Sequence, residues 1–206
     1  MANERKRNPE TTKGAILDAA EQLFLSKGFA ETSTAEVATL AGVNKSLIHH
    51  HFGTKEALWD ETKRRIFATY HDLQKDLLKQ AEGDAELLRI SLISYFEFLA
   101  ERPEFGRMMC MMYLQGDSSC EDLADELIHS GVKKIREAQE GGYLRGDLNP
   151  IFILISFLSL VEHWFLSKGH FFSSHFPNMS EAETKALDQN YLKDLIKMYF
   201  EGILAR

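Results

Sequence analysis

Apolar residues recur along the chain at the three- and four-residue spacing of amphipathic helices, and no stretch alternates with period two for long enough to predict a sheet. Glycine, proline and N-capping residues divide this pattern into about nine segments. The predicted helices span residues 11–27, 33–41, 44–52, 54–80, 84–101, 105–114, 119–139, 151–166 and 190–204, and residues 168–183 are expected to form a loop. The fold class is therefore expected to be all-α.

Two of these helices are very short, and both carry clear start signals. Ser33-x-x-Glu36 has the form of a capping box, and Asn44 is a good N-cap for the next helix. Isolated helices below roughly 12 residues are marginal in water, so both need the helix over 11–27 behind them. We therefore predict an N-terminal DNA-binding domain over residues 1–53 and a C-terminal effector-binding and dimerisation domain over residues 54–206.

The two short helices have the spacing of a helix-turn-helix. Ala41-Gly42-Val43-Asn44 suits a tight turn between them, and Ile48 and Phe52, at i and i+4, place one side of the second helix inward. The opposite side then offers side chains that suit base edges and phosphates in a major groove. These residues are Lys45, Ser46, Leu47, His49 and His50. On geometry alone, an ordinary tight turn in a helical protein remains the alternative.

The net charge of −7 is distributed unevenly. Up to Arg65 the chain has ten Lys or Arg and nine Asp or Glu, whereas the rest of the chain has 14 Lys or Arg and 22 Asp or Glu. The acidic remainder would be repelled by DNA. Four basic residues near the start have the sign expected of an arm that faces phosphates, although a solvated polar tail explains them equally well. They are Arg5, Lys6, Arg7 and Lys13.

The segment from Gly28 to Leu58, GFAETSTAEVATLAGVNKSLIHHHFGTKEAL, resembles the DNA-binding domain of the TetR family of transcriptional regulators. The preceding AILDAAEQLFLSKGF extends the resemblance over the first helix without a gap. It implies a repressor that binds double-stranded operator DNA as a homodimer and is released by a small-molecule effector. Repression is the common mode of the family.

The resemblance also implies roles for individual positions. Ser33 and Thr34 would meet backbone phosphates at the start of a helix, where anions bind well. Lys45, Ser46 and Leu47 would read bases. His49 and Lys55 would contact phosphates, although the family usually has tyrosine at the position of His49.

Three consecutive histidines, His49 to His51, raise the question of a metal site. Adjacent helical residues point about 100° apart, whereas two ligands on one helix normally lie at i, i+3 or i+4. We therefore predict no metal here. Histidine ordinarily titrates near pH 6.5, so protonated His49 or His50 is expected to strengthen operator binding as the pH falls.

The helix over 151–166 is apolar nearly all round, so it must be covered. Its apolar run is shorter than the roughly 18 residues of a membrane span, which favours a buried helix and no membrane partner. The resemblance implies that helices 151–166 and 190–204 pair with their copies in a homodimer. The alternative is that both are internal core. A dimer places two heads roughly 34–36 Å apart, the spacing of successive major grooves.

The resemblance further implies an effector pocket among the middle helices. A methionine-rich segment lies there, and methionine adapts to ligands of varied shape. We expect a hydrophobic or aromatic effector, and filling of the core is the alternative role for the same side chains. The candidate ligand-binding residues are Phe96, Met108, Met109, Met112, Tyr113, His163 and Trp164.

Several other classes of protein lack support in the sequence. Cys110 and Cys120 match no zinc spacing and, with a polar start that has no signal segment, indicate a reducing cytoplasm. The chain shows no phosphate-binding loop, nucleophile elbow or catalytic metal motif, so we predict neither enzyme activity nor a cofactor. An interaction protein whose head no longer binds DNA is the other alternative, and the presence of Lys45 and Lys55 argues against it.

Overall fold

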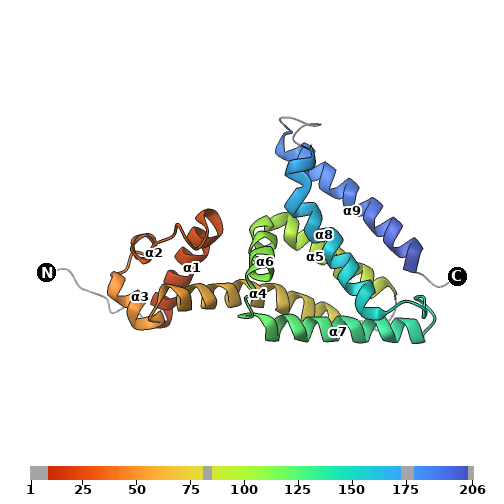
Figure 1. Cartoon of the computed structure of the whole chain (residues 1–206), viewed down its shortest axis with the longest axis horizontal. Helices are drawn as coiled ribbons and strands as arrows, with labels where there is room; N and C mark the ends of the chain where they lie inside the picture. Colours follow the sequence, from red (N-terminus) through yellow and green to blue (C-terminus); the bar gives the residue numbers. More distant parts are fainter. Residues whose placement is uncertain (1–8, 81–84, 173–178, 204–206) are drawn as a thin grey trace. The chain divides into compact units, whose positions relative to one another are not determined.

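The computed structural model describes residues 9–80, 85–172 and 179–203, which form nine helices and no strand (Figure 1). The expected all-helical fold is thereby confirmed. The helices are α1 (Pro9–Lys27), α2 (Thr34–Ala41), α3 (Lys45–Phe52), α4 (Lys55–Gln80), α5 (Ala85–Glu101), α6 (Pro103–Gln115), α7 (Glu121–Glu140), α8 (Pro150–Phe172) and α9 (Glu181–Ile203).

The predicted loop over residues 168–183 was wrong at both ends. Helix α8 continues through Gly169 to Phe172, and α9 begins at Glu181. A capping box starts α9, because the Ser180 amide donates to Glu183 Oε2 at 2.8 Å while the Glu183 amide donates to Ser180 Oγ at 3.3 Å. Residues 173–178 of the expected loop lie outside the described residues.

Contacts divide the chain into two units. The first comprises the chain up to Ala68 together with Asp117–Cys120, the loop after α6. The second comprises Thr69–Gly116 and the chain from Glu121 onward. The predicted boundary between residues 53 and 54 lies just before α4, which begins at Lys55, and the first half of α4 makes its contacts within the first unit.

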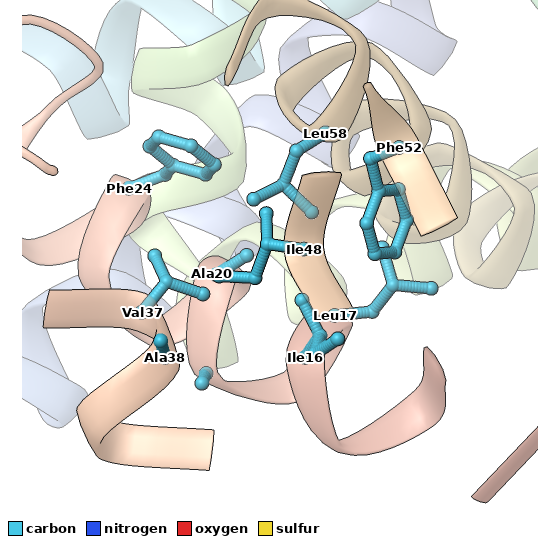
Figure 2. Close-up of a cluster of buried hydrophobic side chains, with 10 residues drawn as sticks. Ile16, Leu17, Ala20, Phe24, Val37, Ala38, Ile48, Phe52 and Leu58 are labelled. Carbon is cyan, nitrogen blue, oxygen red and sulfur yellow. The ribbon is translucent and has the colours of Figure 1, made fainter. Parts of the chain in front are cut away.

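The first unit is built around one apolar cluster from α1, α2, α3 and the start of α4 (Figure 2). Four of its side chains are 0% exposed, namely those of Ile16, Ala20, Val37 and Ile48. The other buried members are Leu17, Ala19, Phe24, Ala38, Phe52 and Leu58. The two helices too short to be stable alone are therefore held by shared apolar contacts, as the sequence pattern predicts.

Ion pairs fix α1 and the loop after α6 against α4 within the first unit. Arg65 reaches α1, where its guanidinium lies 2.8 Å from Asp18 Oδ1 and 2.7 Å from Glu21 Oε2. Lys63, only 2% exposed, pairs with Asp60 at 2.9 Å and also with Asp117 of the loop. The start of α4 thus serves as a common support for these segments.

The second unit buries the apolar face predicted for α5, and α8 contacts α5, α6 and α7. The buried α5 residues are Leu88, Leu92, Tyr95, Phe96 and Leu99. Helix α9 lies alongside α8 (Figure 1), and the Tyr191 hydroxyl donates to the Leu160 carbonyl at 3.1 Å. Of the described helices, α8 is long and apolar enough to cross a membrane by length and composition alone.

Candidate nucleic-acid interface and effector site

The N-terminus of α2 is organised by Ser33. The Ser33 amide donates to Glu36 Oε2 at 2.9 Å, and the Glu36 amide donates to Ser33 Oγ at 3.2 Å, which completes the predicted capping box. Lys27 Nζ lies 2.7 Å from Glu36 Oε1. This ion pair and the capping hydrogen bonds lower the pKa of Glu36 to about 2. Thr34, the first residue of α2, is partly exposed beside this cap.

The turn between α2 and α3 depends on Gly42. This residue has φ +65°, a left-handed conformation that glycine adopts without steric cost, and its amide caps α2. Asn44 then caps α3, because its Oδ1 accepts from the Ser46 amide at 3.0 Å. The helix-turn-helix inferred from the spacing is thus present, with both start signals where the sequence predicted them.

The buried residues of α3 fix which side faces outward. Ile48 and Phe52 point into the apolar cluster (Figure 2), and Lys45, Ser46, His49 and His50 are exposed on the rest of the helix. Leu47 differs from the expectation, because it packs partly against the cluster and is not fully exposed. Leu47 therefore lies at the margin of the cluster, between the buried and the exposed side of α3.

Two exposed side chains of α3 differ in whether a neighbouring residue fixes their polar atoms. Lys45 makes no hydrogen bond or ion pair with any described residue, so its ammonium retains all three donors. Ser46 Oγ lies 3.0 Å from Asn44 Oδ1, which directs the hydroxyl toward the N-terminus of the helix. The N-terminal end of α3 therefore offers one unrestrained cation beside a positioned hydroxyl.

The His49 ring is oriented by a hydrogen bond to the residue that caps the C-terminus of α3. Nδ1 lies 2.9 Å from the Gly53 carbonyl, an acceptor only, so Nδ1 carries the proton that is donated. In the neutral ring Nε2 is then an acceptor, which a phosphate repels. Protonation converts Nε2 into a donor. This geometry identifies Nε2 of His49 as the atom on which the predicted pH dependence of operator binding would rest.

Lys55, expected to contact phosphate, lies at the first turn of α4. Its Nζ is 4.3 Å from the centre of the Phe29 ring and 3.5 Å from the Ala30 carbonyl. The cation–π contact positions the ammonium while leaving donors available. Of the predicted basic arm, Lys13 pairs with Glu61 of α4, and Arg5, Lys6 and Arg7 lie outside the described residues.

The seven candidate effector residues lie on α5, α6 and α8 of the second unit. Phe96 and Trp164 both pack on Tyr191 of α9, with the Trp164 and Tyr191 rings 3.9 Å apart and nearly parallel. Trp164 Nε1 also donates to the buried Asp188 at 2.8 Å, so its polar atom is already satisfied. Met108, Met109 and Met112 are buried on α6. Tyr113 and His163 are exposed, and His163 lies beside Phe171.

Sequence reasoning missed a polar cluster in the second unit. The Tyr95 hydroxyl donates to Glu162 Oε1 at 2.6 Å, and the Tyr95 ring lies 5.2 Å from that of Tyr70. Burial and the charge of Glu162 raise the pKa of Tyr70. The one available signal was a lone carboxylate that follows the apolar run of α8.

No group of three His, Cys, Asp or Glu side chains suited to holding a metal ion occurs in the described part of the chain. His50 and His51 instead contact each other edge to face, with ring centres 5.3 Å apart. The fold and the outward-facing α3 define a helix-turn-helix protein of the DNA-binding class.

Comparison with known proteins specifies the class further. Residues 16–62 match the family model described as bacterial regulatory proteins, tetR family. The chain is 24% identical over 184 residues to the HTH-type transcriptional regulator TtgR of Pseudomonas putida, covering 81% of this chain and 86% of TtgR. It is 22% identical over 198 residues to the HTH-type transcriptional repressor NicS of Pseudomonas putida, covering 93% of each.

Two solved structures share the fold. The fatty acid degradation regulator FadR from Bacillus halodurans has a TM-score of 0.71 at 15% identity, covering 95% of this chain and 97% of that one. The ketosteroid transcriptional regulator KstR2 of Mycobacterium tuberculosis has a TM-score of 0.67 at 18% identity, covering 100% and 98%. Over residues 16–62 the chain matches the TetR family of bacterial regulatory proteins, and it is a DNA-binding transcriptional regulator.

Proposed function

We propose that this protein is a cytoplasmic repressor that binds a palindromic operator as a homodimer and is released by a small apolar effector. The observation that carries the proposal is the outer side of α3. A helix braced by Ile48 and Phe52 presents Lys45, Ser46 and His49 to solvent. We infer no catalytic role, since the known relatives regulate transcription.

The chemistry of this face suits duplex DNA. Lys45 is able to donate to a guanine edge or a phosphate, and Ser46 to donate or accept, as direct readout in the major groove requires. The N-termini of α2 and α3 add backbone amides and the positive end of each helix dipole toward phosphates. Lys55 adds a cation at the N-terminus of α4. Contacts of this kind give both sequence discrimination and salt-dependent affinity.

The exposed face of α8 supports the dimer. Phe152 is 66% exposed, Ile155 45%, Leu160 43% and Leu166 42%, so one side of the helix leaves large apolar side chains in water. Polar residues such as Ser156, Ser159 and His163 share this side, which suits a protein interface better than lipid. On α9, Met198 is 65% exposed and extends the apolar surface. We propose that both helices pair with those of a second copy, through residues 151–166 and 190–204.

Release by an effector follows a two-state scheme. A ligand that binds one arrangement of the helices more tightly shifts the population toward that arrangement. If the favoured arrangement does not match the groove spacing, the ligand lowers the affinity for the operator. By reciprocity, operator DNA lowers the affinity for the ligand by the same factor. The methionine-rich α6, with Met108, Met109 and Met112 buried, provides an adaptable apolar wall for a ligand.

The test is a gel-shift titration on the promoter next to the protein's own gene at several salt concentrations. Lys45→Ala and Lys55→Ala are each expected to weaken binding about tenfold and to reduce the salt slope by about one. Lys79→Ala is the matched control, since this lysine is 63% exposed on α4 outside the first unit, and its loss should change nothing. Equal affinities for all four proteins would contradict the proposed interface.

A further inference from the structure

The carboxylate of Glu162 is the one acidic group on the long apolar helix α8 between Pro150 and Phe172. It is partly buried, and its hydrogen-bond donor is the hydroxyl of the buried Tyr95, at 2.6 Å. No lysine, arginine or histidine of the described residues forms an ion pair with it. A partly buried carboxylate thus stands without a compensating cation, an arrangement that disfavours its ionised form and that a bound cation would stabilise.

The surroundings of Glu162 also affect the acidity of its carboxyl group. Burial raises the pKa of Glu162, although the hydrogen bond from Tyr95 opposes this effect. By contrast, the carboxylate of Asp188 on α9 is buried and has Lys168 Nζ at 2.7 Å. The carboxylate of Asp188 is therefore paired with a lysine, whereas the only donor to the carboxylate of Glu162 among the described residues is a neutral hydroxyl.

Aromatic rings cluster beside Tyr95, the hydrogen-bond partner of this carboxylate. The Tyr70 ring has its centre 5.2 Å from Tyr95, 5.1 Å from Phe98 and 5.6 Å from Phe105. The faces of such rings attract cations. The cluster already holds one at its margin, because the Arg102 guanidinium lies 5.8 Å from the centre of the Phe98 ring.

The helix that lies beside these rings is apolar. Phe105 belongs to α6, as do the buried Met108, Met109 and Met112. Tyr113, at the end of α6, lies close enough to Glu162 for the carboxylate charge to act on its hydroxyl. Helices α4, α5, α6 and α8 thus bring one negative charge, ring faces and an apolar wall together.

We propose that Glu162, with the rings of Tyr70 and Tyr95, binds the charged nitrogen or phosphorus centre of a cationic, largely apolar effector. This inference rests on the proposed function, because it names the chemical class of the effector that releases the operator. The carboxylate receives the positive charge, the rings surround it, and the methionine side chains contact the apolar body. An anionic effector of the same shape is rejected by the same carboxylate.

The experiment compares two probes of nearly identical shape and opposite charge. Binding of tetraphenylphosphonium and of tetraphenylborate to the full-length protein is measured by calorimetry. The wild type is expected to bind the phosphonium at least about tenfold more tightly than the borate. In Glu162→Gln the phosphonium affinity should fall about tenfold while the borate affinity stays level or rises. Glu97→Gln removes an exposed carboxylate from the helix that carries Tyr95 and should behave as wild type.

Each result has a defined meaning. Equal binding of the two probes by wild type, or equal loss in both carboxylate variants, overturns the cationic effector site. Because the wild-type comparison needs no variant, it decides the matter even if Glu162→Gln fails to fold. Operator binding is measured separately by gel shift. Normal operator binding without charge preference overturns this inference alone, and charge preference without operator binding overturns the proposed function.

Discussion

Helices α3 and α8 each leave one side exposed, and the two sides differ completely in chemistry. The exposed side of α3 carries Lys45, Ser46, His49 and His50. The exposed side of α8 carries large apolar residues, led by Phe152 at 66% exposure. Both helices are anchored by buried residues on the other side, Ile48 in α3 and Phe157 in α8, each 0% exposed.

The difference teaches that anchoring and recognition are separate properties of one helix. The buried side determines how the helix is oriented, and the exposed side determines which partner it suits. Charged and hydroxyl groups on a braced helix suit the polar edges of bases. Apolar side chains in water suit a second apolar surface, whose burial the hydrophobic effect favours.

The largest effect is expected from placing a charge on the apolar side of α8. Phe152→Glu should convert the dimer to a monomer and reduce operator affinity by about a hundredfold or more, because the second head no longer binds intramolecularly. Light scattering after size exclusion and a gel shift measure the two changes. Leu114→Glu is the control, since Leu114 is 78% exposed on α6. A dimeric Phe152→Glu variant would remove α8 from the interface.

The next effect comes from weakening the buried side of α3. Ile48→Ala should destabilise the first unit by about 2–5 kcal/mol, the usual cost of a cavity at a fully buried site. Chemical denaturation followed by circular dichroism gives the free energy of unfolding. Leu40→Ala, at a residue 48% exposed on α2, should cost within about 0.5 kcal/mol. Similar losses in both variants would show that burial in this cluster does not support α3.

A smaller, several-fold effect is expected from His49. Since Nδ1 donates to the Gly53 carbonyl, only the protonated ring offers a donor at Nε2 to a phosphate. Operator affinity of the wild type should therefore rise when the pH is lowered from 8 to 6. His49→Phe should lose this rise, and His51→Phe, a change in the partly buried neighbour, should keep it. The same pH dependence in wild type and His49→Phe would exclude this role.

The smallest effect concerns the cap of α2. The Lys27 ion pair and the Ser33 hydrogen bonds lower the pKa of Glu36 from its ordinary 4.5 to about 2. A carboxylate with a lowered folded-state pKa stabilises the protein above about pH 4.5, and that contribution is lost as the pH falls toward 2. Glu36→Gln should therefore show a shallower fall in unfolding free energy over this interval. Glu31→Gln, at an exposed neighbouring site, should retain the wild-type slope.

Much of the first unit was predictable because its signals are local. Ser33-x-x-Glu36, Gly42 and Asn44 determine where α2 and α3 begin and end, and the i, i+4 pair Ile48 and Phe52 determines the buried side. The start of α9 carries an equally local signal at Ser180-x-x-Glu183. We missed this signal because the preceding segment, rich in phenylalanine, serine and histidine, indicated a loop. The partial burial of Leu47 depends on neighbouring helices and was not readable from the pattern.

The candidate effector region was predictable only in part. The methionines of α6 are buried, but Phe96 and Trp164 contact Tyr191 of α9, far away in sequence. The cluster of Tyr70, Tyr95 and Glu162 comes from three helices, and no spacing within any one of them indicates it. Long-range packing of this kind leaves no periodic trace in the sequence.

Footprinting on the DNA upstream of the protein's own gene, at low ionic strength, tests the outward face of α3 most directly. The wild type should protect two half-sites whose centres lie about one helical turn apart, and Lys45→Ala should lose this protection at the same protein concentration. Absence of any protected site with wild type, or unchanged protection with Lys45→Ala, would contradict the assignment of α3 as the surface that reads DNA.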